Sequence, residues 1–371
     1  MMSRSTPRTS RAAVLLLCSS WAAQPYSVLS HEAIVDAAWE DSIKPILLQR
    51  FPNTTPADLL KAHAYVYGGS IIQDMGYYPF GSHLFSDLTH YIHSGDFIVN
   101  MLAESQDLNE YAFALGSLAH YAADNTGHAL AVNKSVPLLY PKVRRKFGPV
   151  ATYEDNKTDH LRVEFAFDVA QVAEQRYAPN AYHAFIGFEV SKPLLERAFQ
   201  TTYGIPLTDV SKNIGLALGT YRWTVSTLIP EMTRVAWDAK KKEILKNDPR
   251  ADRSQYIYAI SRSSFEKEWG TTYVRPGPGA RLLALLLSFI PKIGPLRSLA
   301  FHPATPETQK LFMDSFVQTL VLYKEKLAEL KRGEKPDLPN TNFDTGEPAR
   351  PGAYRLADEA AAKLSKILAE K

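Results

Sequence analysis

The sequence predicts an all-α protein, a multi-helix bundle with a metal site buried between its helices. Two observations support this prediction. Helical periodicity with capping residues recurs along most of the chain, whereas period-2 alternation and a strand–turn–helix rhythm are rare. Histidines and carboxylates recur four residues apart within helical stretches, which places them on one helix face. Hydrophobic residues make up 45% and charged residues 22% of the 371, so the composition is that of a globular protein.

The first 25 residues have the pattern of a secretory signal peptide. Arg4, Arg8 and Arg11 form a positively charged region before a short apolar run, Ala12–Cys18, and small residues follow that run. That run is too short to span a bilayer. We therefore expect a secreted or periplasmic protein. Because Cys18 is the only cysteine, the mature chain would contain no disulfide and no thiolate metal site.

Start and stop signals predict the individual helices. Ser30 is expected to cap a helix that carries His31 in its first turn. Thr55-Pro56-Ala57-Asp58 is a capping box that opens a helix ending at Gly68-Gly69. Thr305-Pro306 opens the last long helix, which ends near residue 332. Other helices are expected at 109–125, 158–172, 191–199, 208–245 with a kink at Pro230, and 356–368.

The domain organisation is expected to follow from two unusual C-terminal segments. Residues 26–270 are expected to form the main helical domain, and residues 271–371 a helical extension. Arg281–Leu296 is apolar but interrupted by prolines, so it is either a buried core segment or an interfacial hairpin that contacts a membrane. Residues 334–352 are rich in Pro, Asp, Asn and Gly, which predicts an extended loop or linker.

Two helices carry side chains of the types that bind metals. His120, Asp124 and His128 follow one another four residues apart, and each step rotates the position by only about 40° around the helix. His160 and Glu164 have the same spacing. The residues around His120 are small and apolar, so Asp124 is expected to be buried, where an uncompensated charge is costly. A bound cation would remove that cost, and zinc accepts imidazole and carboxylate ligands.

Further candidate ligands precede these two helices. His31 lies near the expected mature N-terminus, and Asp74 lies in a glycine-containing loop. Three histidines follow this loop, and His90 fits the pattern best by spacing, although His83 and His93 are close. Other catalytic signatures are absent from the sequence, including a G-x-S-x-G elbow, a P-loop and an H-E-x-x-H zinc motif.

The order of these residues resembles the zinc-dependent phospholipase C family, which shares its helical fold with the single-strand-specific zinc nucleases. The H-x-x-x-D at 120–124 and the H-x-x-x-E at 160–164 carry the resemblance, which covers about residues 26–170. It implies two to three zinc ions. The implied ligands are Asp74, His90, His120 and Asp124 for the first ion, His128, His160 and Glu164 for the second, and His31 with a bridging Asp124 for the third.

Two features of this sequence differ from the family's pattern. The family's third ion is also bound by the mature N-terminal residue, a tryptophan, whereas Tyr26 stands at the corresponding position here. The step from Asp124 to His128 is shorter than is usual in the family. We therefore expect a distortion of the helix at 125–127.

The resemblance implies an exported zinc-dependent phosphodiesterase, phospholipase C-like, that uses metal-activated water, with Asp74 as an additional base. The implied substrate is a phospholipid or another phosphodiester. Tyr77, Tyr78 and Tyr91 are candidates for contacts with a headgroup, with packing in the core as the alternative. A single-strand nuclease-like phosphodiesterase and a non-catalytic, zinc-stabilised binding protein remain open. The net charge of +3 gives no reason to expect a specific nucleic-acid partner.

Overall fold

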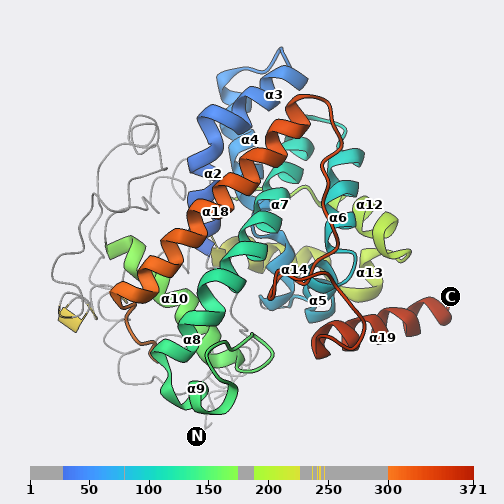
Figure 1. The fold of residues 1–371 in the computed structure, drawn as a ribbon. Coiled ribbons are helices and arrows are strands. Elements are labelled where there is room, and N and C mark those ends of the chain that lie inside the picture. The colour runs from blue at the N-terminus through green and yellow to red at the C-terminus, as the bar shows by residue number, and fades with distance from the viewer. Residues whose placement is uncertain are drawn as a thin grey trace, which may run out of the picture.

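The described part of the chain is all-α. The structure is a computed structural model that describes residues 28–78, 80–173, 188–225 and 300–371, with the isolated positions Ala236, Lys240, Lys242, Glu243 and Lys246. Within these residues there is no β-strand, and one isolated β-bridge joins Thr341 to Pro348. The all-α prediction is therefore confirmed (Figure 1).

Within residues 28–173 the helices follow one another with short connections. The first nine are α2 (Val28–Ala38), α3 (Lys44–Arg50), α4 (Pro56–Gly69), α5 (His83–Tyr91), α6 (Ser94–Glu104), α7 (Leu108–Gly127), α8 (Asn133–Leu139), α9 (Pro141–Phe147) and α10 (Lys157–Ala173). Later in the chain come α12 (Lys192–Tyr203), α13 (Leu207–Val210), α14 (Ile214–Trp223), α18 (Pro306–Lys331) and α19 (Arg355–Ala369). A 3-10 helix, η2 (Ile72–Tyr77), and two π-helical turns, η1 (Trp39–Ile43) and η3 (His128–Val132), lie between them.

Helix α7 lies at the centre of the bundle and is buried along most of its length. It crosses α4 at very short distance because both helices present glycine at the crossing. A Cβ on Gly69 would lie 2.0 Å from the carbonyl oxygen of Phe113, and a Cβ on Gly116 would lie 2.0 Å from that of Val66. The capping box of Thr55 and Asp58 is present and fixes the start of α4. This crossing brings the C-terminal end of α4 next to the middle of α7.

Helix α18 lies across α2 and α7 (Figure 1). Its Tyr323 hydroxyl donates a hydrogen bond to the carbonyl oxygen of Leu115 in α7, at 2.9 Å. Thr305 caps this helix, as its sequence signals predict. Helix α19 packs against α5. No helix among the described residues is long and apolar enough to span a membrane.

Three local expectations need correction. Ser30 does not cap a helix, because α2 already includes Val28, and its hydroxyl instead lies 3.3 Å from Asp168 Oδ1. A continuous helix from residue 208 is wrong, because the chain leaves helical geometry at Ser211 and a new helix starts after Asn213, whose side chain caps it. Asp74 lies in the 3-10 helix η2 and not in an irregular loop.

Several expectations fall outside the described residues. They are the signal peptide at 1–25, the mature N-terminal position Tyr26, the kink at Pro230 and the apolar segment Arg281–Leu296.

Candidate metal centre

Helix α7 presents His120 and Asp124 on one face, and His128 follows in the π-helical turn η3. All three side chains are almost completely buried. The expected distortion occurs here, one residue later than predicted, because α-helical geometry persists through Gly127 and the wider turn begins at His128. His128 Nε2 still lies 3.9 Å from Asp124 Oδ2, so both side chains face the same region.

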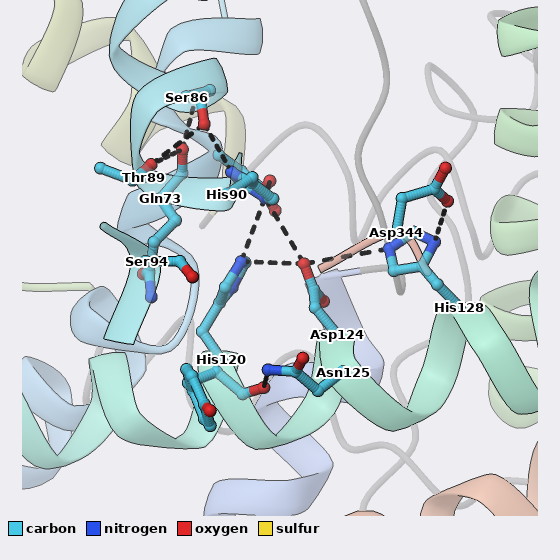
Figure 2. Close-up of polar contacts among 12 residues, drawn as sticks. Gln73, Ser86, Thr89, His90, Ser94, His120, Asp124, Asn125, His128 and Asp344 are labelled. Atoms are coloured by element: carbon cyan, nitrogen blue, oxygen red, sulfur yellow. Dashed lines mark hydrogen bonds and ion pairs between the residues drawn. The ribbon is translucent and has the colours of Figure 1, made fainter. Parts of the chain in front are cut away.

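The first group of candidate ligands consists of Asp74, His90, His120 and Asp124. His90 Nε2 lies 3.2 Å from Asp74 Oδ1, 3.4 Å from Asp124 Oδ2 and 3.4 Å from His120 Nε2. His120 Nε2 lies 3.1 Å from Asp124 Oδ2. Figure 2 shows the side chains of His90, His120 and Asp124 pointing toward one another. These residues come from η2, α5 and α7, so the bundle brings together ligands that are distant in the sequence.

Backbone carbonyls fix the orientation of both imidazoles in this group. His90 Nδ1 lies 2.7 Å from the carbonyl oxygen of Ser86, and His120 Nδ1 lies 2.9 Å from that of Ser70. Because a carbonyl only accepts, each Nδ1 carries the proton and donates it, which leaves the lone pair of each neutral ring on Nε2. Both lone pairs therefore point into the space between the two carboxylates, as in metal sites whose histidines are held by an outer hydrogen bond.

The second group of candidate ligands consists of His128, His160 and Glu164. His128 Nδ1 lies 2.9 Å from His160 Nε2, and His160 Nε2 lies 2.8 Å from Glu164 Oε1. His160 and Glu164 project from one face of α10, as their spacing predicts. All three side chains are at most 2% exposed.

His31 lies on the other side of Asp124. Its Nε2 is 3.4 Å from Asp124 Oδ1, and its ring stacks on that of His120 with centroids 4.5 Å apart. Asp124 therefore directs Oδ1 toward His31 and Oδ2 toward the first group. A carboxylate in this position would hold one cation through each of its oxygens.

The distances and the donor set fit zinc. Four N or O atoms held tetrahedrally at about 2.0–2.1 Å from one zinc would lie about 3.3 Å from one another. Four of the six separations in the first group, those that involve His90 and the one between His120 and Asp124, are 3.1–3.4 Å and match this value. The described residues make no hydrogen bond of normal geometry to the carboxylate oxygens of Asp74, Asp124 or Glu164. A cation would compensate these buried oxygens.

Burial and the neighbouring ligands together determine the electrostatics of the cluster. Burial raises the pKa of Asp74 and raises that of Glu164 well above the usual range. Burial also lowers the pKa of His160 well below its usual range, which keeps the ring in the neutral form that binds metals. Burial opposes ionisation of Asp124 too, but His120 and His90 outweigh it and hold the pKa of that carboxyl well below normal.

Comparison of the sequence with models of known protein families identifies the family to which these residues belong. Residues 30–213 match the family model of zinc dependent phospholipase C. Through these residues, the chain belongs to the zinc-dependent phospholipase C family. The match includes all eight ligands expected from the sequence, from His31 to Glu164. Comparisons with curated proteins and with solved structures gave no match.

Membership of the phospholipase C family supports a zinc-dependent phosphodiesterase of the phospholipase C type, with a phospholipid as its implied substrate. Three clusters of histidines and carboxylates are positioned to hold metal: Asp74, His90 and His120; His31, His120 and Asp124; and His128, His160 and Glu164.

The other histidines considered from the sequence lie outside the candidate metal centre. His83 is exposed at the start of α5. His93 is also exposed, and its Nδ1 lies 2.9 Å from Asp96 Oδ2 at the surface. Of the three histidines that follow η2, the structure therefore brings His90 to the candidate ligands.

The aromatic residues suggested for headgroup binding are buried. Tyr77, Tyr78 and Tyr91 are each at most 6% exposed. Tyr78 packs edge-on against Tyr221, and Tyr91 packs against Tyr354. These contacts correspond to the alternative of core packing. Phe80, beside them in the sequence, is 49% exposed and offers its ring to solvent.

The sequence reasoning missed one buried carboxylate beside the second group. Asp344 is buried, and its Oδ1 lies 3.4 Å from His128 Nδ1 and 3.9 Å from His160 Nε2. It lies in the segment expected to be a linker and beyond the residues that match the phospholipase C family. No spacing pattern could reveal it, because an isolated aspartate in an irregular segment has no periodicity.

Proposed function

We propose that the protein is an exported phospholipase C that hydrolyses phospholipids at a zinc centre formed by His31, the first group and the second group. One observation carries the proposal. His90 Nε2 lies 3.2–3.4 Å from the other three ligand atoms of the first group, and His120 Nε2 lies 3.1 Å from Asp124 Oδ2, which are separations that a single zinc requires, within the part of the chain that belongs to the phospholipase C family.

The residues of the centre have separate tasks in this proposal. His90 and His120 direct Nε2 lone pairs into the site because Ser86 and Ser70 hold their other nitrogens. Asp124 joins the first group to His31 through its two oxygens. When bound, zinc supplies Lewis acidity that polarises a phosphoryl oxygen and makes water more acidic.

Asp74 is the proposed proton acceptor. Its Oδ1 faces His90, which leaves Oδ2 available to take a proton from the attacking water. The water oxygen would form a bond to phosphorus, and the bond from phosphorus to the glycerol oxygen would break. The proton would pass to that leaving oxygen. The products are diacylglycerol and a phosphorylated headgroup.

The experiment compares two matched histidine variants. Purified protein is assayed on phosphatidylcholine vesicles and on single-stranded DNA. His90→Ala should lower the rate on vesicles on the order of 100-fold or more, because metal catalysis contributes several kcal/mol. His93→Ala, which removes an exposed imidazole three residues later, should leave the rate unchanged. Equal rates for the two variants would contradict the proposed site, and turnover of DNA alone would favour the nuclease reading.

Export and membrane contact are further parts of this proposal. The basic and apolar pattern of residues 1–25 supports export, and the apolar sequence Arg281–Leu296 supports peripheral contact with the lipid surface. N-terminal sequencing of the protein recovered outside the cytoplasm tests export. A chain that retains residues 1–25 and remains in the cytoplasm would contradict it.

A further inference from the structure

The segment 338–349, between α18 and α19, is fastened to the bundle beside the metal centre. Its β-bridge, Thr341 to Pro348, folds it back on itself. Gly346 has a φ of 71°, and a Cβ there would lie 2.7 Å from the carbonyl oxygen of Asn125 in α7. Further hydrogen bonds join the segment to α5, α6, α7 and α8: Phe343 N to His90 O, Ser94 Oγ to Thr341 O, Tyr121 Oη to Pro339 O and Asn133 Nδ2 to Asp344 O.

Phe343 places this segment directly against the first group. Its side chain is completely buried, and its ring centroid lies 5.4 Å from that of His90 and 6.1 Å from that of His120. The segment therefore forms part of the wall of the centre, although it follows Glu164 by a long stretch of chain.

Asp344, the next residue, has one anchored oxygen and one oxygen directed at the second group. Oδ2 accepts hydrogen bonds from the backbone N–H of Tyr153, at 2.9 Å, and from the hydroxyl of Tyr354, at 2.7 Å. Oδ1 receives no hydrogen bond from the described residues and lies near His128 Nδ1 and His160 Nε2 (Figure 2 shows Asp344 beside His128). A carboxylate held in this way presents a fixed oxygen to a metal.

A hydrogen bond from His128 to Asp344 would not account for the cluster. His128 Nδ1 lies 3.4 Å from Asp344 Oδ1 but 2.9 Å from His160 Nε2, and the latter atom lies 2.8 Å from Glu164 Oε1. One proton on each neutral ring cannot satisfy two nitrogens and two ionised carboxylates that converge on the same space. A cation among the four groups satisfies all of them.

We propose that Asp344 is a fourth protein ligand of the second zinc site, so that a part of the chain outside residues 30–213 completes this site. The inference rests on the zinc chemistry of the proposed function. In this proposal the contact between Asp344 and the second zinc also holds the segment 338–349 against the bundle. The donor set of two imidazoles and two carboxylates suits zinc.

The test measures zinc content and local protection, not only activity. Asp344→Asn keeps the shape of the side chain but removes the charged ligand, and Asp337→Asn is the control because Asp337 is exposed just before the segment. After dialysis, elemental analysis should find one zinc equivalent fewer in Asp344→Asn than in wild type, and no change in the control. Hydrogen exchange of residues 338–349 should become faster in Asp344→Asn and in chelated wild type.

The outcomes separate this inference from the proposed function. A wild-type protein without zinc would refute both. If wild type contains zinc and Asp344→Asn contains the same amount, only the role of Asp344 as a ligand is refuted. Faster lipid hydrolysis by an Asp344→Asn protein that keeps its zinc would refute the same role, because Asp344 would then be blocking the site. If Asp344→Asn does not fold, Tyr354→Phe removes one donor to Oδ2 and should weaken zinc retention about tenfold or more. Unchanged retention in Tyr354→Phe would count against the inference.

Discussion

Removal of zinc should destabilise the fold by an amount that can be worked from the structure. Asp74, Asp124 and Glu164 are at most 2% exposed, and their oxygens receive no regular hydrogen bonds from the described residues. Removal of the cation leaves these groups as buried polar atoms without compensation. The free energy of unfolding should therefore fall, because the folded state has to bury them and the unfolded state does not.

The magnitude follows from the two ligand groups. Loss of one partner from a buried ion pair costs about 3–5 kcal/mol, so two groups give about 6–10 kcal/mol. Unfolding entropy of about 2.1 cal/mol/K per residue amounts to about 0.8 kcal/mol/K for 371 residues. The melting temperature should therefore fall by roughly 8–13 °C on chelation.

Scanning calorimetry of loaded, chelated and reloaded protein measures this change, with elemental analysis of each sample. Re-addition of zinc should restore the melting temperature. His120→Ala should lose only about 4–6 °C on chelation, because its first group is already incomplete while the second group can still hold zinc, whereas His93→Ala should respond like wild type. A melting temperature that stays within about 2 °C after complete removal of zinc would refute the reasoning.

Two further predictions concern positions outside the ligand set. Gly116→Ala should lower the free energy of unfolding, measured by urea titration, by about 1–3 kcal/mol or more, because its Cβ would meet the carbonyl oxygen of Val66. It should also reduce zinc retention. Gly215→Ala is the control, because open space surrounds Gly215, and it should be neutral or stabilising by up to about 1 kcal/mol. Burial raises the pKa of Asp87 to about 6, so its contribution to stability is present below its unfolded pKa near 3.8 and is lost as the pH rises through 6. Asp87→Asn should therefore stabilise the protein by about 1–2 kcal/mol at pH 7 and by nothing at pH 3.5, and an equal gain at both pH values would contradict this.

The sequence predicted which candidate ligands share a helix face, because helical spacing fixes the direction of a side chain. His120 and Asp124 share a face of α7, and His160 and Glu164 share a face of α10, whatever the rest of the fold does. Ser30 shows the limit of local signals. Its identity suits a cap, but Asp168 from α10 contacts it and the helix begins earlier.

Asp344 could not be predicted from the sequence for a different reason. Its position depends on contacts with α6, α7 and α8, and none of these is encoded near residue 344. The composition of the segment predicted an irregular backbone correctly but could not indicate what that backbone would pack against. The wider turn at His128 is similar, since a distortion was expected from the ligand spacing but its type and starting residue were not.

The position of α18 has a consequence for folding during synthesis of the chain. This helix covers α7, and its Tyr323 hydroxyl donates a hydrogen bond to the carbonyl oxygen of Leu115. Phe343 packs beside His120. A nascent chain that has emerged only as far as residue 213 holds the whole family match but neither of these elements. Closure of the interior therefore has to wait for residues 306–343, and a fragment ending at residue 213 should be a substrate for proteolysis.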